Sequence, residues 1–391
     1  MEYPNISPLY DAFGRQRVSS PNTIWESSFL YDLQPLLFEQ ATTGTGTITH
    51  SATNSCAVLS AGGTGTASMQ SYRYIRYQPG KSQLIKITFN LNATVAGSTK
   101  RIWYGDGANG IYLERTASGV RIGKISSTDE PDEVIEQDDW NVNSFTSGAY
   151  VLDTTKNQIL VIDAQWLGVG RVRVGFVFFG SVFWAHTFNH SNNSLYPYTK
   201  SFTLPIKAEI SGTAADSMHF ICSSVESEGG VENEPGFTFT QEGTVTAASG
   251  ARTHILSIQP RTTFNSIANR SLLILESIDV LVTGANPIEW ELTYGNVLTG
   301  TTTFNDVNAT YSGVQFNTLG TTGTPAIIAA SGFVAASGAI KSSVSAILNQ
   351  RYPLTLDAAG VVRSLGRASL CVTGIGGTSA CRATMTWREV R

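Results

Sequence analysis

The stretch QILVIDAQWLGVGRVRVGFVFFGSVFWAHTF, residues 158–188, decides the fold class of this chain. Apolar and polar residues alternate along much of it, and β-branched and aromatic side chains dominate, as in antiparallel strands with one buried face. Gly180-Ser181 lies between two apolar runs and is a two-residue hairpin signal. The stretch therefore predicts adjacent antiparallel strands of a meander or a jelly roll.

The same alternation continues on both sides of this stretch. It recurs in QLIKITFNLN (83–92) and GIYLERT (110–116), and again near the C-terminus in RATMTWREV (382–390). We expect an all-β protein with an antiparallel β-sandwich or jelly roll over residues 41–230 and a second β-rich domain over residues 231–391.

The boundary between these two domains is expected in EGGVENEPGFTFTQEG, residues 228–243, where glycines, a proline and acids gather. The segment SAILNQ (345–350) is the one place where we expect a short helix. Charged residues make up only 14% of the chain, against about 25% in an average soluble domain. This shortage disfavours long exposed helices.

The first 40 residues form a segment of a different kind. Four prolines, at positions 4, 8, 21 and 35, alternate with aromatic residues and leucines. Repeated prolines prevent a continuous helix or a central strand, yet the segment is too apolar to remain in water alone. We expect an extended N-terminal arm over residues 1–40 that lies on its own domain or on a neighbouring subunit.

Interface residues are predicted from this arm and from one strand of the sandwich. Arg171 and Arg173 alternate with valines, so both cations leave the same face of a strand. The candidate contact residues are Tyr10, Phe13, Arg15, Arg17, Trp25, Arg171 and Arg173.

Charge and hydropathy limit the partners of the chain. The formal net charge is −4, so a whole-surface nucleic-acid binder is not expected. Low surface charge also removes the repulsion that keeps monomers apart, which favours a homo-oligomer. The start of the chain lacks a signal-peptide pattern, and no run of about 18 apolar residues exists, so we expect neither export nor membrane insertion.

No catalytic or cofactor-binding residue is predicted. GDGANG (105–110) matches G-x-G-x-x-G, but the chain continues as a strand where a dinucleotide site needs a helix, so a hairpin turn is expected. Gly80-Lys81-Ser82 resembles the end of a phosphate-binding loop, yet Ile75 stands where that loop needs glycine. The sequence contains neither G-x-S-x-G nor H-E-x-x-H.

Metal binding has two candidate locations. His186 and His190 are close in sequence, but they follow a strand, so loop or cross-strand contacts are the favoured interpretation. The acidic segment 129–139 is open to three interpretations: a solvated loop, a calcium site, or a subunit contact or pairing with Arg171 and Arg173. The solvated loop is favoured, and no metal is predicted.

Four cysteines are too few to stabilise a chain of this length by disulfides, so we expect them to be reduced and packed. They are Cys56, Cys222, Cys371 and Cys381. Cys371 and Cys381 flank TGIGGTSA, a turn-like segment, and would face each other if it were a hairpin, so a disulfide there stays an open alternative.

Tryptophans are the candidates for stacking on sugars, namely Trp103, Trp140, Trp166, Trp184, Trp290 and Trp387. Trp166 and Trp184 lie in dense apolar strands and are expected in the core. An exposed groove shared by Trp103, Trp140 and the acidic segment would support carbohydrate binding or cleavage.

Several long motifs resemble a family of tailed-bacteriophage virion proteins over roughly residues 8–240. These motifs are DAFGRQRVS (11–19), YDLQPLLFE (31–39), IRYQPGKSQL (75–84), DWNVN (139–143), VIDAQWLGVGRVRVGFV (161–177) and ICSSVESEGG (221–230). Residues 159–188 are also similar to the central strands of concanavalin-like lectin jelly rolls.

The resemblance implies a non-enzymatic structural component of the virion, assembled in the host cytoplasm, with other virion proteins as partners. The leading interpretation is a homo-oligomeric tail, fibre or adaptor protein. One alternative is a capsid decoration or head-fibre protein. Another is a carbohydrate-binding receptor protein that takes a host-surface glycan.

Overall fold

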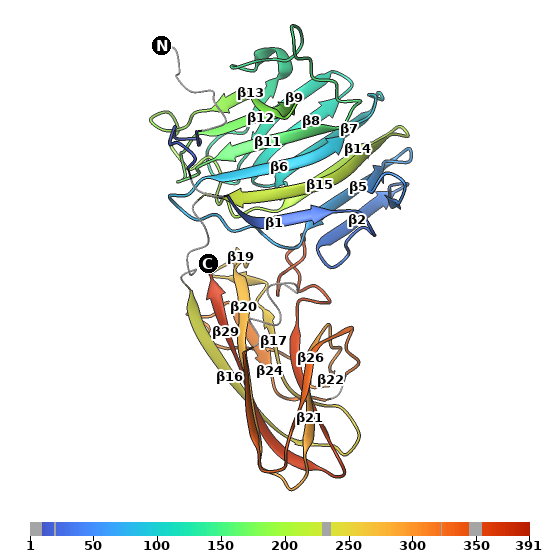
Figure 1. Cartoon of the computed structure of the whole chain (residues 1–391), viewed down its shortest axis with the longest axis vertical. Coiled ribbons are helices and arrows are strands. Elements are labelled where there is room, and N and C mark those ends of the chain that lie inside the picture. The colour runs from blue at the N-terminus through green and yellow to red at the C-terminus, as the bar shows by residue number, and fades with distance from the viewer. Residues whose placement is uncertain (1–9, 19–20, 229–235, 322, 344–353) are drawn as a thin grey trace. The chain divides into compact units, whose positions relative to one another are not determined.

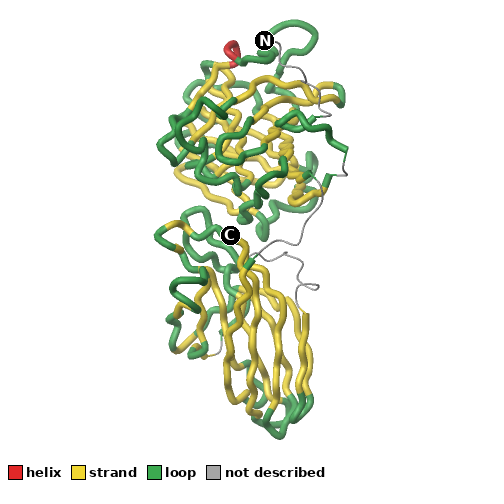
Figure 2. Tube along the Cα trace, turned by 90° about the vertical axis from the view of Figure 1, so that its left-hand side faces the viewer, coloured by secondary structure: helices red, strands yellow, loops and turns green. Residues whose placement is uncertain are grey.

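The computed structural model describes residues 10–18, 21–228, 236–321, 323–343 and 354–391. The chain divides into two compact units, Met1–Glu232 and Asn233–Arg391. Within the described residues the helical content is one short 3-10 turn, η1 (Gln137–Asp139), and strands make up the rest of the regular structure (Figure 2). The predicted all-β fold is confirmed. The short helix expected over 345–350 lies outside the described residues.

The N-terminal unit consists of two antiparallel sheets (Figure 1). Sheet I runs in the order β13-β12-β11-β6-β15-β4-β3, with β1 also paired to β15. Its strands are β1 (Asn22–Ser28), β3 (Thr47–Ser51), β4 (Cys56–Ser60), β6 (Gln83–Asn90), β11 (Gln158–Ala164), β12 (Val172–Phe178), β13 (Ser181–Phe188) and β15 (Ser217–Ser227).

Sheet II runs in the order β10-β9-β8-β7-β14-β5-β2. Its strands are β2 (Phe38–Gly44), β5 (Gly65–Ser71), β7 (Ser98–Gly105), β8 (Gly110–Thr116), β9 (Gly119–Ile125), β10 (Glu133–Glu136) and β14 (Ile206–Gly212). The GDGANG segment is the β7–β8 hairpin turn, since Gly105 pairs with Gly110 and the carboxylate of Asp106 accepts hydrogen bonds from the backbone N–H groups of Ala108 and Asn109. This confirms the predicted hairpin.

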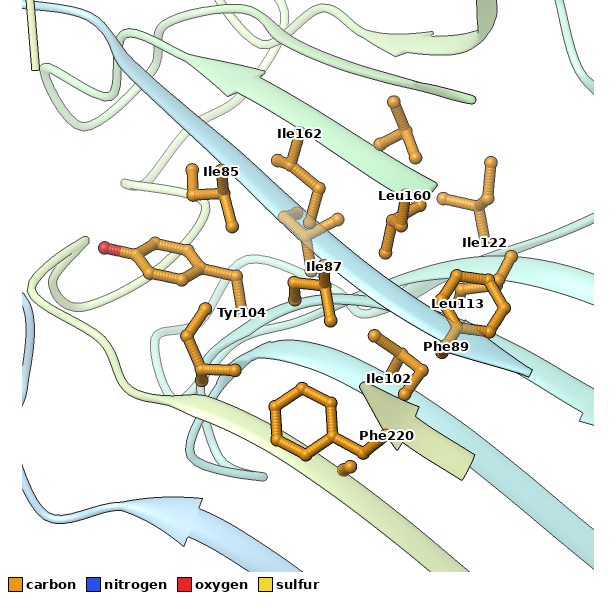
Figure 3. Close-up of a cluster of buried hydrophobic side chains, with 14 of the residues drawn as sticks. Ile85, Ile87, Phe89, Ile102, Tyr104, Leu113, Ile122, Leu160, Ile162 and Phe220 are labelled. Carbon is orange, nitrogen blue, oxygen red and sulfur yellow. The ribbon is translucent and has the colours of Figure 1, made fainter. Parts of the chain in front are cut away.

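The core of this unit lies between the two sheets. Side chains alternate across a strand, so Ile85, Ile87 and Phe89 of β6 all point inward, and all three are fully buried. Figure 3 shows them with Leu160 and Ile162 of β11, their cross-strand neighbours. Sheet II closes the core from the other side with residues such as those labelled in the same figure, Ile102, Tyr104, Leu113 and Ile122.

The expected N-terminal arm is shorter in the structure than in the prediction. Residues 22–28 form β1 on the edge of β15, and residues 38–44 form β2 of sheet II. Trp25 is 5% exposed, and its Nε1 donates to Ser223 Oγ at 2.9 Å. From Asn22 onward the segment is therefore part of the sandwich, because aromatic residues at alternate positions can fill the core.

The β12–β13 hairpin turns one residue earlier than expected. Phe178 pairs with Ser181, so Phe179 and Gly180 occupy the central positions, with φ of 50° and 82°. Two positive φ angles define a type I′ turn, which matches the strand twist and normally takes Asn-Gly. The predicted Gly180-Ser181 pair was therefore wrong by one position, since cross-strand register selected the turn.

The C-terminal unit also has two main antiparallel sheets. Sheet III runs in the order β16-β29-β20-β27 and sheet IV in the order β23-β24-β17-β28-β21-β26. Sheet III contains β16 (Phe237–Ala247), β20 (Leu272–Val282), β27 (Ala339–Ser343) and β29 (Ser379–Val390). Sheet IV contains β17 (Thr253–Pro260), β21 (Ile288–Tyr294), β23 (Asn305–Asp306), β24 (Val314–Asn317), β26 (Ile327–Val334) and β28 (Ala368–Gly374).

Two small hairpin-like pairs complete the unit: β18 (Thr263–Phe264) with β19 (Ile267–Ala268), and β22 (Thr299–Gly300) with β25 (Gly320–Thr321).

Cys371 lies on β28 and Cys381 on β29, which belong to different sheets, and both are free buried thiols. Burial raises the pKa of each thiol to about 11. The disulfide alternative is therefore wrong, because the segment between them crosses between sheets.

Candidate functional site

The DAFGR segment forms a closed turn on the N-terminal unit. The carboxylate of Asp11 accepts hydrogen bonds from the backbone N–H of Phe13 at 2.9 Å and of Arg15 at 2.8 Å, and from Arg15 Nε at 2.6 Å. Gly14 has a φ of +79°, a region that favours glycine. Tyr10 and Gln16 close the turn with an isolated bridge. The aspartate thus organises its own backbone.

Two arginines of the predicted contact row hold this turn from outside. Arg171 Nε donates to the carbonyl of Ala12, and Arg173 Nη2 donates to the carbonyl of Tyr10. Asp11 and Ala12 are buried, whereas the side chain of Phe13 is half exposed. The turn therefore acts as a strap bound to the β12 region of its own chain.

Charged side chains anchor the chain that follows the turn. Asp163 of β11 is fully buried and pairs with Arg17 Nη2 at 2.7 Å and with Arg173, its cross-strand neighbour. Arg17 Nε also pairs with Glu228 Oε1 at 2.6 Å. The guanidinium carbon of Arg173 lies 4.4 Å from the centre of the Trp184 ring, so the ring covers the buried cation.

We call the six residues Asp11, Arg15, Arg17, Asp163, Arg173 and Glu228 the strap cluster. Its three carboxylates face three guanidinium groups. Burial raises the pKa of Asp163, although Arg17 and Arg173 oppose that rise. Burial likewise raises the pKa of Glu228 against the influence of Arg17. The charges are therefore tolerated because each one is paired.

Motifs that are far apart in the sequence meet at the strap cluster. Its members come from DAFGRQRVS, from VIDAQWLGVGRVRVGFV and from the end of ICSSVESEGG. IRYQPGKSQL joins them, because Arg15 Nη1 donates to the carbonyl of Gly80 at 3.2 Å. Four of the motifs that carry the family resemblance thus build one site.

The structure places the seven predicted interface residues unequally. Phe13 and Arg15 are exposed, and Tyr10 is half-buried. Arg17, Arg171 and Arg173 bind within their own chain, and Trp25 is part of the sandwich core. Trp25 and Arg173 are therefore corrected from surface contacts to buried residues of this unit.

The acidic partners Asp11, Asp163 and Glu228 were not predicted from the sequence. A signal existed at Asp163, since a carboxylate in the apolar run LVIDA must find a partner when the strand is buried.

The outer face of sheet II carries a second polar and aromatic arrangement, the sheet II patch: Arg101, Trp103, Tyr112, Glu114, Arg121, Lys207 and Glu209. The rings of Trp103 and Tyr112 lie 4.3 Å apart, with Arg101 over both. Glu209 accepts a hydrogen bond from Trp103 Nε1 at 3.0 Å. The two rings are only 3% and 7% exposed. A sugar would therefore have to displace side chains before it could stack on them.

The carboxylates of the sheet II patch are fully engaged with cations. Glu114 pairs with Arg101 at 2.5 Å and Arg121 at 2.6 Å, and Glu209 pairs with Lys207 at 2.7 Å. Burial tends to raise the pKa of Glu209, but Lys207 and Arg101 outweigh it, so the pKa lies below its ordinary value. The general acid of a glycosidase needs a carboxyl group with a raised pKa, and the lowered pKa of Glu209 is the opposite of that requirement.

Trp103 and Trp140 are both buried, so they do not share an exposed groove with the acidic segment. Trp140 is buried in the core and stacks on Phe176, with ring centres 5.9 Å apart. In the acidic segment, Glu133 pairs with Lys124 and Glu136 with Arg121, so the alternative of pairing with Arg171 and Arg173 is wrong. Among the described residues, no group of three or more His, Cys, Asp or Glu is placed to hold a metal ion.

The two histidines make the polar contacts that were expected. His186 Nδ1 accepts from the backbone N–H of Asn141 at 3.3 Å, and His190 Nδ1 donates to the carbonyl of Gly170 at 2.9 Å. Burial lowers the pKa of both imidazoles.

In the described part of the chain, no helix has the length and apolar character needed to cross a membrane.

Comparison with known proteins gives likeness only at the level of solved structures. No family model and no curated protein matches the chain. A β-glucanase of Bacillus licheniformis is 11% identical with a TM-score of 0.32, over 55% of this chain and 100% of that one.

A glycosyl hydrolase family protein of Mycobacterium fortuitum is 13% identical with a TM-score of 0.37, over 52% and 99% of the two chains. The carbohydrate recognition domain of Emp46p, in its potassium-bound form, is 11% identical with a TM-score of 0.32, over 53% and 98%. At these values the likeness carries no argument about function.

Proposed function

We propose that this chain is a structural component of a tailed-bacteriophage virion that acts by assembly rather than by catalysis. One observation carries the proposal: four of the motifs that resemble the virion family converge on the strap cluster, whose charges are all paired. Residues grouped for chemistry would keep a reactive group free. Here each carboxylate is occupied by a guanidinium group.

The strap cluster suits an assembly role for a physical reason. Buried ion pairs contribute little net stability, but removing one partner is costly, so they favour a single arrangement of the groups they join. Here that arrangement fixes where residues 10–17 run on the sandwich. A protein built into a particle in many copies needs its terminal segment in one reproducible place.

Within the virion we favour the tail, its fibre or its adaptor region, with a capsid position as the alternative. Imaging of native phage particles with a gold-labelled antibody against the purified chain tests both. Label at the tail supports the leading proposal, and label on the head supports the alternative. Particles that carry the chain's gene but bind no label would refute a virion role.

A second candidate function, binding of a host-surface glycan, rests on the sheet II patch. Guanidinium groups, carboxylates and two aromatic rings lie together on the outer face of sheet II. They offer hydrogen bonds to a sugar, and stacking once the side chains that cover the rings of Trp103 and Tyr112 move aside. Titration of the purified chain with host-surface polysaccharide tests it. Saturable binding that is lost in R101A but kept in K156A, an exposed lysine outside the patch, would support this function. An absence of binding would exclude it.

A further inference from the structure

The outer edge of sheet III is the long strand β16. It has eleven residues and pairs with β29 without any shift in register. Among the described strands, β29 is its only pairing partner. Alternate backbone N–H and C=O groups of such an edge point away from the sheet, and this row is a template for another strand.

β16 lacks the features that usually protect an edge. It contains no proline, no lysine and no arginine, and its single charge, Glu242, is paired with Arg382 of β29 at 3.5 Å. Its threonines at 238, 240, 244 and 246 are exposed. Phe237 is 63% exposed at the start of the strand.

Other described edges of the molecule are shorter, irregular or covered. The edge of β13 is covered by the DWNVN loop: the backbone N–H of Asn143 donates to the carbonyl of Ala185 at 3.0 Å, and Asn141 exchanges two hydrogen bonds with the backbone of Thr187. β26 has a register shift, and β10 has four residues. β16 is the longest edge strand among the described residues.

We propose that β16 is the strand through which two copies of this chain join, in antiparallel pairing with the β16 of the second copy. This rests on the proposed assembly function and names its interface. Another strand is the kind of partner that fits this edge, because the groups along it are backbone donors and acceptors. A second copy fits because the edge carries one charge that is already paired, so two identical edges do not repel each other.

The sequence of β16 selects one register for this pairing. With Gln241 opposite Gln241, Thr238 lies opposite Thr244, and Phe237 lies opposite Val245. Thr–Thr and aromatic–β-branched cross-strand pairs are stabilising.

In the same register Phe239 lies opposite Gly243, whose side-chain position is filled by the backbone carbonyl of Ile255, so the register depends on the threonine pairs and on Phe237 with Val245. A register displaced by two residues, with Glu242 opposite Glu242 of the second copy, brings like charges together and is disfavoured. The chosen register also covers the exposed ring of Phe237.

The register can be tested with charges on the exposed face of β16. In T238K/T244K each new lysine opposes a lysine of the second copy, and T238E/T244E does the same with carboxylates. Each variant alone is expected to be monomeric, while an equal mixture is expected to form a heterodimer through opposite charges. The control T384K/T386K places the same charges on the same face of sheet III, one strand away from the edge.

The measurement is light scattering coupled to size-exclusion chromatography of the full chain over a series of increasing protein concentrations, because a small interface gives a dimer that depends on concentration. Circular dichroism verifies that each variant is folded. A dimer for wild type and control, monomers for both edge variants and a dimer for their mixture support the proposal.

A monomeric wild type, or edge variants that dimerise as well as wild type, would overturn the β16 interface. The virion proposal has a separate readout, because particle labelling does not depend on which strand joins the copies.

Discussion

Replacing Asp163 by asparagine tests whether the strap cluster behaves as a buried ion-pair network. Asp163 is fully buried and is shared by Arg17 and Arg173, so D163N leaves the buried Arg173 guanidinium without its carboxylate. Breaking a buried pair by removal of one partner costs about 3–5 kcal/mol. Asparagine keeps one acceptor oxygen, so we expect the lower end, about 3 kcal/mol.

For a unit of this size, each kcal/mol corresponds to roughly 2–4 °C of Tm, so the expected fall is about 6–12 °C. Urea and thermal unfolding followed by tryptophan fluorescence measure it, since Trp184 stacks on Arg173. D153N is the control, because Asp153 is partly exposed and forms its ion pair with the exposed Lys156 at 3.6 Å. Asparagine keeps the Oδ1 that accepts hydrogen bonds from Thr155, so a change below about 0.5 kcal/mol is expected.

Coupling between the arm and the strand is measured by the double-mutant cycle of D163N with R17Q. The two changes should be non-additive by about 1 kcal/mol or more, because Arg17 and Asp163 are in direct contact. A D163N protein within about 1 kcal/mol of wild type would refute the reasoning. Full additivity in the cycle would show that residues 10–17 are not held by this pair.

Three further changes probe other parts of the structure. Burial lowers the pKa of His254 to about 4, so the folded state resists protonation of this imidazole. The free energy of unfolding of the C-terminal unit should therefore fall by about 3 kcal/mol as the pH falls from 6.5 to 4. Urea unfolding at several pH values should show this loss in wild type but not in H254N. A Cβ on Gly123 would lie 2.0 Å from Cζ of Tyr112, so G123A should cost about 1–3 kcal/mol in thermal unfolding, and the same cost in a Y112A background would contradict the clash. Phe179 is 94% exposed with a φ of 50°, so F179N should stabilise the N-terminal unit by about 0.5–1 kcal/mol, whereas a lower Tm would show that the ring is needed.

The candidate site shows how far local sequence information reaches. The arginines at 171 and 173 were identifiable as a row because strand periodicity places alternate residues on one face. Their partners were not identifiable, since Arg17 and Asp163 are 146 positions apart and meet only when residues 10–17 lie on sheet I. Trp25 was misplaced for a related reason: an aromatic residue near prolines has the same local pattern whether it lies in an arm or in an edge strand.

The sequence by itself determined the all-β class, the strand segments and the GDGANG hairpin, because alternation and turn chemistry are properties of a few neighbouring residues. Only the tertiary structure decided which strands are neighbours. Pairing across sheets separated Cys371 from Cys381, buried Trp140, paired the acids of β10 with Lys124 and Arg121, and left β16 at an edge. Such outcomes depend on contacts between residues far apart in the chain, whose cost in chain entropy is recovered only when whole sheets pack together.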